Sequence, residues 1–216
     1  MSKLIFLLLI FIPNFLIGQP TKKVTDKDSH ETYFVLKSDK TTRHGEYKKF
    51  NYNNRLLVKG YYKLGVKDSI WESFDFDGNL SVKYDYTNNK LITHNPGDFA
   101  EGREFRILNE SDSDTILSRI PIFLYGDYYI FSVIIENLHY PASARENGIM
   151  GKVYVLFTID KAGKASNFHV NTPLGYGMDE ESIRVLKLIP DNWLPGLLND
   201  RPVDVEVSFP INFTLK

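Results

Sequence analysis

The strongest constraint on the fold is a strictly alternating run in the last third of the 216-residue chain. In residues 152–159 every second position is apolar and strongly β-forming, namely Val153, Val155, Phe157 and Ile159. Because successive side chains of a strand point to opposite faces, this run predicts a strand with one buried face. Residues 203–213 alternate in the same way, interrupted by Pro210. The two runs therefore predict two strands of one sheet.

Helix signals lie around these strands. Pro141 can begin a helix, since proline is tolerated in the first turn, and Gly148 stands where a helix C-cap is expected. Residues 165–172 return as a second strand, and residues 178–189 have helical spacing. The order helix, strand, strand, helix, strand predicts an α+β module over 138–216, with two helices on a three-stranded antiparallel sheet.

The chain upstream is rich in aromatic and turn residues and contains an internal repeat. Residues 45–65 can be laid over residues 69–89 at a constant offset, so that Tyr47 falls on Trp71. Each unit reads as a strand, an Asn/Gly turn and a strand, which predicts stacked β-hairpins that share a buried aromatic face. Residues 33–95 are therefore expected to form a β-rich region.

These units resemble the MORN-like repeats of secreted bacterial proteins. The residues that carry the resemblance are Gly45-Glu46-Tyr47, Gly60-Tyr61-Tyr62, Gly65, Trp71 and Asp77-Gly78-Asn79-Leu80. The second unit departs from the pattern at Ser69 and Tyr84, where glycine is usual. The resemblance implies a scaffold or a binding surface, and the alternative is a small β-sheet without that relationship.

The remaining segments are less regular. Residues 1–18 have one lysine, an apolar centre and a small residue at the end, which predicts a secretory signal peptide and a mature start near Gln19. The alternative is an uncleaved membrane anchor. Residues 19–32 are polar and are expected to form a mobile leader. Residues 96–137 are expected to connect the two regions, with two strands around a Tyr-Gly-Asp turn or one strand on each side of a looser bend.

Composition excludes several functions. The net charge is −1, so no basic surface favours binding to nucleic acid. The absence of cysteine rules out disulfides, thiolate catalysis and cysteine-based zinc sites. Hydrolase, metalloprotease, P-loop and dinucleotide-binding motifs are missing, and residues 75–79 read as a hairpin turn rather than a calcium loop. We therefore expect a protein that is not an enzyme and has no cofactor or metal.

The C-terminal module resembles the C-terminal domain of TonB, which couples inner-membrane energy to outer-membrane receptors. The resemblance covers 138–216 and implies that the domain's last strand pairs with a receptor's short N-terminal segment, the TonB box. The residues that carry it are Tyr140-Pro141-x-x-Ala144-Arg145, Gly148-x-x-Gly151 with the alternating strand to Asp160, Gly163, Met178-Asp179-Glu180-Glu181, Trp193-x-Pro195-Gly196, and Pro202-Val203 leading to Phe213.

The last strand is therefore the candidate site. A proline inside a strand suggests an edge with an unpaired side, and such an edge can accept a peptide as an additional strand. The competing interpretation makes Tyr140, Trp193 and Phe209 core or corner residues. The candidate peptide-binding residues are Val203, Val205, Val207, Phe209, Ile211 and Phe213, with Tyr140 and Pro141 beside them.

The functional hypothesis is an exported, periplasmic TonB-family protein that binds an outer-membrane TonB-dependent receptor or another envelope protein. Its expected role is in transmembrane transport or energy coupling. The chain lacks the long proline-rich spacer of a full transducer, and its apolar N-terminal segment carries no histidine, so energy transfer is expected only if the N-terminus stays uncut. The alternative is a structural envelope-interaction protein in which the MORN-like repeats bind the partner. In that alternative the C-terminal module only packs or forms a homodimer.

Overall fold

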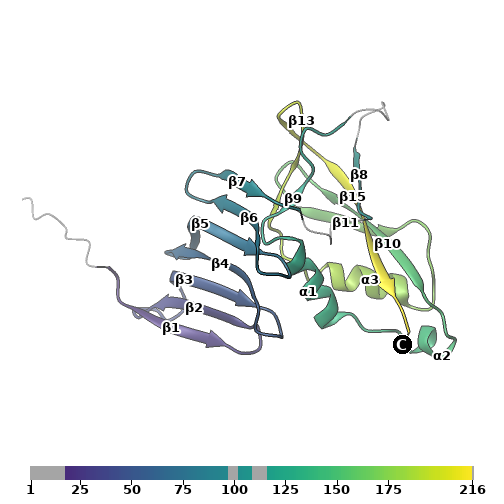
Figure 1. The fold of residues 1–216 in the computed structure, drawn as a ribbon, viewed down its shortest axis with the longest axis horizontal. Helices are drawn as coiled ribbons and strands as arrows, with labels where there is room; N and C mark the ends of the chain where they lie inside the picture. Colours follow the sequence, from purple (N-terminus) through teal and green to yellow (C-terminus); the bar gives the residue numbers. More distant parts are fainter. Residues whose placement is uncertain (1–17, 97–101, 109–115, 216) are drawn as a thin grey trace, which may run out of the picture.

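The computed structural model describes residues 18–96, 102–108 and 116–215. The predicted signal peptide or anchor lies outside these residues, except for Gly18. The first part of the chain forms a seven-stranded sheet and the second forms a helix-and-sheet part. Figure 1 shows the two parts beside each other, with α1 (Asp127–Asn137) between them. Within the described residues, no helix has the length and apolar character needed to cross a membrane.

The N-terminal sheet is an antiparallel meander in which each strand pairs with its neighbours in the chain. Residues with positive φ, such as Asn54 and Gly78, reverse the chain between strands, as the Asn/Gly pattern predicts. In one turn the Asp75 carboxylate accepts hydrogen bonds from the backbone N–H groups of Asp77 and Asn79. The strands are β1 (Thr21–Asp26), β2 (Glu31–Leu36), β3 (Arg43–Phe50), β4 (Leu56–Lys63), β5 (Val66–Phe74), β6 (Leu80–Asp85) and β7 (Lys90–His94).

The prediction of a mobile leader over 19–32 is wrong. Residues Thr21–Asp26 form β1, which pairs antiparallel with β2 in continuous register. Because β1 is an edge strand with mostly solvent-facing side chains, it tolerates Lys22, Lys23 and other polar residues. The polar composition of residues 19–32 therefore gave no indication of β1, which is held by backbone pairing to β2.

The β-hairpins expected from the repeat are present. Tyr47 on β3 and Trp71 on β5, which the repeat offset matches, are both buried and stack with ring centroids 5.2 Å apart. Gly60 on β4 lies directly under the indole, because a Cβ there would come within 2.2 Å of a Trp71 ring carbon. The β-rich prediction is confirmed, whereas the MORN-like relationship stays a prediction.

The second part contains the predicted order of helix, strand, strand, helix and strand. These elements are α2 (Ala142–Glu146), β10 (Gly151–Ile159), β11 (Ala165–Val170), α3 (Met178–Leu186) and β15 (Val205–Phe213). The prediction of three strands is wrong, because β8 (Glu104–Ile107) joins the sheet from upstream and gives the order β11-β10-β15-β8. Two short pairs are also present: β9 (Ile122–Phe123) with β12 (Trp193–Leu194), and β13 (Gly196–Leu198) with β14 (Arg201–Val203).

The prediction of strands on both sides of the Tyr-Gly-Asp turn is also wrong. Only the two-residue β9 precedes the turn, and the apolar run after it is the helix α1. A short continuous apolar run fits a buried strand and a buried helix equally well, so periodicity alone does not separate them. The run is apolar on almost every side because α1 lies between the seven-stranded sheet and α3.

One hydrophobic core joins the two parts. It includes Trp71 from the N-terminal sheet, Tyr125 and Tyr128 around the start of α1, and Trp193 from β12. Trp71 and Tyr125 stack with centroids 6.0 Å apart, and Phe123 lies 4.9 Å from the ring of Trp193. Burial of this aromatic surface holds the N-terminal sheet against the C-terminal module.

Candidate peptide-binding edge

The apolar candidate residues of β15 point inward. Val205, Val207, Ile211, Phe213 and Phe209 are at most 8% exposed and belong to the core. Val203 lies outside this strand, at the end of β14. Phe209 and Trp193 therefore lie in the core, as the competing interpretation expects. Because these side chains are buried, β15 can contact a partner strand mainly through its backbone N–H and C=O groups.

The backbone groups that face the edge can be assigned from one hydrogen bond. The Leu108 N–H donates to the Asp204 carbonyl at 2.9 Å, so this carbonyl faces β8. β15 pairs with β10 along its whole length without a shift in register. Because the backbone groups of alternate residues point to the same side, every even-numbered residue of β15 faces this edge: Glu206, Ser208, Pro210 and Asn212. Pro210 thus places its missing N–H on the edge, as expected of a strand proline.

β8 covers part of this edge. It pairs antiparallel with β15, with Ile107 opposite Val205 and Glu104 opposite Ser208. Gly102 continues alongside, since a Cβ on it would lie 3.4 Å from the ring of Pro210. Among the described residues, the edge has no strand partner beyond Ser208.

Two arginines attach this covering segment. The Arg103 guanidinium lies 2.7 Å from the Asp127 carboxylate, and the two side chains are only 6% and 13% exposed. Arg103 also lies over the Phe209 ring, 5.6 Å from its centroid. Arg106 pairs with Glu206 at 2.8 Å, but its side chain is 72% exposed. The first pair is a buried anchor and the second is a surface contact.

The domain that contains β15 matches a known protein family. The matched family is described as Gram-negative bacterial TonB protein C-terminal, and the match covers residues 136–215. Residues 136–215 form a TonB C-terminal domain. This family of non-enzymatic transport-coupling domains interacts with TonB-dependent receptors in the cell envelope. Comparisons with curated proteins and with solved structures found no match.

Tyr140 and Pro141 lie at one end of the TonB C-terminal domain. The Tyr140 ring packs edge-on against Phe213 with centroids 5.5 Å apart, and its hydroxyl donates a hydrogen bond to the Ile149 carbonyl. Pro141 is the N-cap residue of α2 and lies beside Gly177. Tyr140 therefore supports the end of β15 from the core side.

Sequence reasoning missed the residues of β8. The segment Glu104 to Ile107 alternates between charged and apolar residues over only four positions, a few residues before an acidic stretch. Its odd-numbered residues face the core of the TonB C-terminal domain, because Arg103 covers Phe209 and Phe105 is opposite Val207. That short alternation was the available strand signal, but it carries no information about which strand is its partner.

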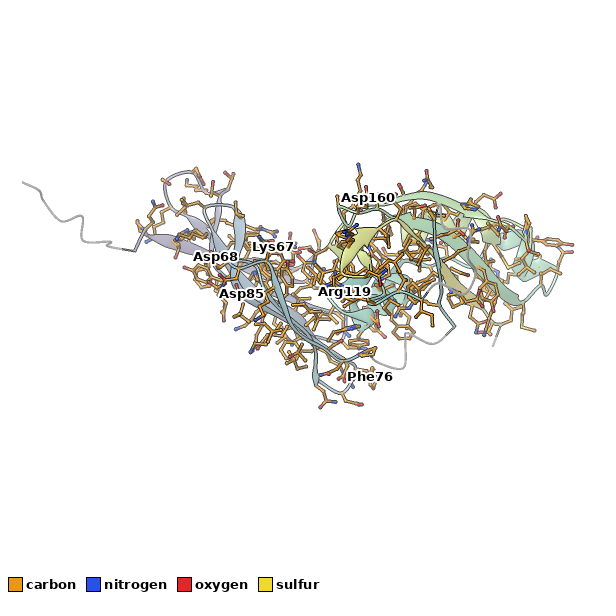
Figure 2. All side chains as sticks on the ribbon, turned by 90° about the horizontal axis from the view of Figure 1, so that it is seen from above. Lys67, Asp68, Phe76, Asp85, Arg119 and Asp160 are labelled. Atoms are coloured by element: carbon orange, nitrogen blue, oxygen red, sulfur yellow. The ribbon has the colours of Figure 1, made fainter. Side chains whose placement is uncertain are left out.

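A second polar feature lies where the sheet meets the TonB C-terminal domain. Figure 2 shows Lys67 on the side of the N-terminal sheet nearest that domain, and its ammonium group donates to Asn192 Oδ1 at 2.8 Å and Tyr86 Oη at 3.2 Å. It also lies 4.5 Å from the centroid of the Tyr125 ring. Burial lowers the pKa of Lys67 to about 8. This lysine links the two parts without a carboxylate partner among the described residues.

Proposed function

We propose that the TonB C-terminal domain binds the TonB box of an outer-membrane TonB-dependent receptor as a strand added to the edge of β15. The family match supports this class of partner. The observation that carries the mode of binding is β8, a strand from outside residues 136–215 that lies antiparallel on this edge. An edge that pairs with one extended segment has the backbone geometry to pair with another.

Backbone hydrogen bonds would supply most of the attraction in this mode of binding. The inward-facing side chains of β15 are buried, so they pack in the core instead of contacting the partner. Asn212 lies on the opposite face of the strand and is exposed, whereas Glu206 on the same face pairs with Arg106 and becomes available to a partner only where β8 is absent. Partner choice would then depend on side chains that alternate between these two faces.

Asn212 provides a direct test with a matched control. Its side chain is exposed and its N–H faces the edge, away from β10. Asn212→Pro removes that donor, whereas Asn212→Ala keeps it and removes only the side chain. We expect a synthetic TonB-box peptide to bind the proline variant about fivefold more weakly than the alanine variant, the size of one hydrogen bond.

The readout is a titration of the full chain that follows the β15 amides by NMR. Chemical-shift changes centred on Glu206, Ser208 and Asn212 would support strand addition at this edge. Binding that leaves these amides unchanged, or equal affinity for the proline and alanine variants, would reject it.

The alternative, in which the repeats bind the partner, is less well supported. The aromatic face of the N-terminal sheet is buried against Phe123, Tyr125 and Tyr128. A partner of this sheet would have to use the other face, where Glu72 forms ion pairs with Lys59 at 2.8 Å and Lys83 at 2.9 Å. A charged face of that kind is typical of a solvated surface.

We further propose that the protein is exported to the periplasm with cleavage near Gln19. The apolar segment before this residue has the length and pattern of a signal peptide. The mass and N-terminal sequence of the chain recovered from the cell envelope test this. A chain that begins at Met1 and stays with the inner membrane would instead identify an anchor.

A further inference from the structure

We infer that β8 is a built-in competitor of the receptor segment, which occupies the β15 edge in the free chain and must leave before a partner strand pairs fully. This inference rests on the proposed function, because it concerns the same edge. It is carried by the register of β8 on β15, by the distribution of backbone donors along β15 and by the buried anchor at Arg103.

β8 covers the part of the edge that forms hydrogen bonds best. Glu206 and Ser208 each present an N–H and a C=O there, opposite Arg106 and Glu104. Beyond this stretch Pro210 has no N–H to donate, so Asn212 is the remaining residue of β15 with a donor on this side. A partner confined to the stretch beyond Ser208 therefore meets a poor backbone edge, and a partner that displaces β8 gains the donors of Glu206 and Ser208.

The side chains of β8 define the chemistry of a segment able to replace it. Phe105 lies opposite Val207 and packs against the core, so an apolar residue is favoured there. Arg106 lies opposite Glu206 on the exposed face and pairs with it, so a basic residue is favoured at that position. The fitting partner is an extended segment with apolar residues on one face and a basic residue opposite Glu206.

Covalent attachment gives β8 an advantage over any free segment. A strand in the same chain competes intramolecularly, with an effective concentration that for tethered segments is on the order of millimolar. Apparent affinity for a second ligand falls in proportion to the fraction of molecules with the edge open. Release of β8 should therefore raise the affinity for a receptor segment without any change in the contacts that the segment makes.

The anchor connects this edge to the rest of the fold. Asp127, which holds Arg103, is the first residue of α1. The next residue, Tyr128, accepts a hydrogen bond from Asn51 Nδ2 of the N-terminal sheet at 2.9 Å. The position of the competitor strand thus depends on α1, which lies between the two parts (Figure 1).

The first arm of the test loosens β8. Arg106→Pro removes the ion pair with Glu206 and the N–H that faces β15, whereas Arg106→Ala removes the ion pair and keeps the N–H. In the full chain, we expect the proline variant to bind a synthetic TonB-box peptide at least about tenfold more tightly than the alanine variant. Hydrogen exchange at the Glu206 and Ser208 amides should be faster in the proline variant.

The second arm locks β8 in place. The chain has no cysteine, so the pair Glu104→Cys and Ser208→Cys introduces a single disulfide between directly opposed residues on the exposed face. The reduced and oxidised forms of this one protein are matched controls. We expect the oxidised form to bind the TonB-box peptide at least about tenfold more weakly than the reduced form. This arm decides the question by itself if the proline variant does not fold.

A second probe separates this inference from the proposed function. A synthetic peptide of residues 102–108 should bind the Arg106→Pro variant and fail to bind the oxidised disulfide form. If the 102–108 peptide behaves in this way and the TonB-box peptide does not bind, β8 is a displaceable occupant of the edge, but the receptor is not its partner. Equal affinity of the TonB-box peptide for all forms would overturn the competitor and leave receptor binding intact. No binding of the 102–108 peptide to a folded Arg106→Pro variant would also overturn it.

Discussion

Lys67 lies where the N-terminal sheet meets the TonB C-terminal domain, and burial lowers its pKa from 10.5 to about 8. Between these values the unfolded chain keeps the proton that the folded chain has lost, so the free energy of unfolding rises with pH. We expect the wild type to gain roughly 1 kcal/mol per pH unit relative to Lys67→Met between about pH 8 and pH 10.

Urea unfolding of both proteins at several pH values measures this gain. The comparison with Lys67→Met cancels the ionisation of the buried tyrosines, whose pKa values are raised by burial. A stability difference that stays constant from pH 7 to 10 would show that Lys67 keeps its ordinary pKa in the folded chain.

Gly60 is required by the packing of Trp71. A Cβ at this position would come within 2.2 Å of the indole ring, which is itself stacked on Tyr47 and Tyr125. Gly60→Ala should therefore lower the free energy of unfolding by about 2 kcal/mol or more, and by less in a Trp71→Leu background. Urea unfolding measures both losses, and equal losses in the two backgrounds would reject this explanation.

At the scale of elements, α1 and β8 depend on one buried ion pair. Asp127→Ala leaves the guanidinium of Arg103 without this carboxylate in a site where the arginine is 6% exposed, and we expect a loss of about 3 kcal/mol. Glu206→Ala breaks the exposed pair with Arg106 and should cost less than about 1 kcal/mol.

Thermal unfolding gives the two stabilities, and hydrogen exchange at the Ser208 amide reports whether β8 stays in place. The prediction fails if the two alanine variants are equally stable, or if the Asp127 variant exchanges at the wild-type rate.

Most elements could be predicted from the sequence where a pattern was long and local. The alternation at 152–159 and at 203–213 predicted β10 and β15, and the repeat predicted hairpins. β1 was missed because an edge strand has no need of an apolar face, and α1 was misassigned because both of its sides are covered. The sequence alone did not decide whether Phe209 is a core residue or a contact for a partner. Alternation predicts that a strand has two faces, but it does not say what covers the edge.

At the scale of the whole molecule, the shared core predicts that the two parts unfold together. Each part contains one of the two tryptophans, Trp71 in the N-terminal sheet and Trp193 in the C-terminal module. In Trp71→Phe, the fluorescence of Trp193 reports the C-terminal part and far-UV circular dichroism reports both. We expect coincident midpoints in denaturant. Separate midpoints would mean that the aromatic contacts between the parts contribute little to stability.

The candidate site was predicted only in outline for a related reason. The prediction of an unpaired edge from Pro210 is wrong for Val205 to Ser208, because β8 pairs with β15 there, although the missing N–H of Pro210 does face away from β10. The occupant of that edge lies about 100 residues upstream, where Arg106 meets Glu206. Pairing between such distant segments depends on the whole chain path, which local patterns do not contain.

The strands of the N-terminal sheet follow one another in chain order, and this order determines how the width of the sheet can change. Because β1 is the outermost strand among the described residues and pairs there with β2 alone, a further hairpin could be added at that edge, or the first one removed, without altering any pairing from β3 to β7. Each such change would move the outer boundary of the sheet by two strand spacings, roughly 9–10 Å. The architecture therefore permits related chains to differ in the span of this sheet in whole-hairpin steps, while the surface next to α1 keeps its shape.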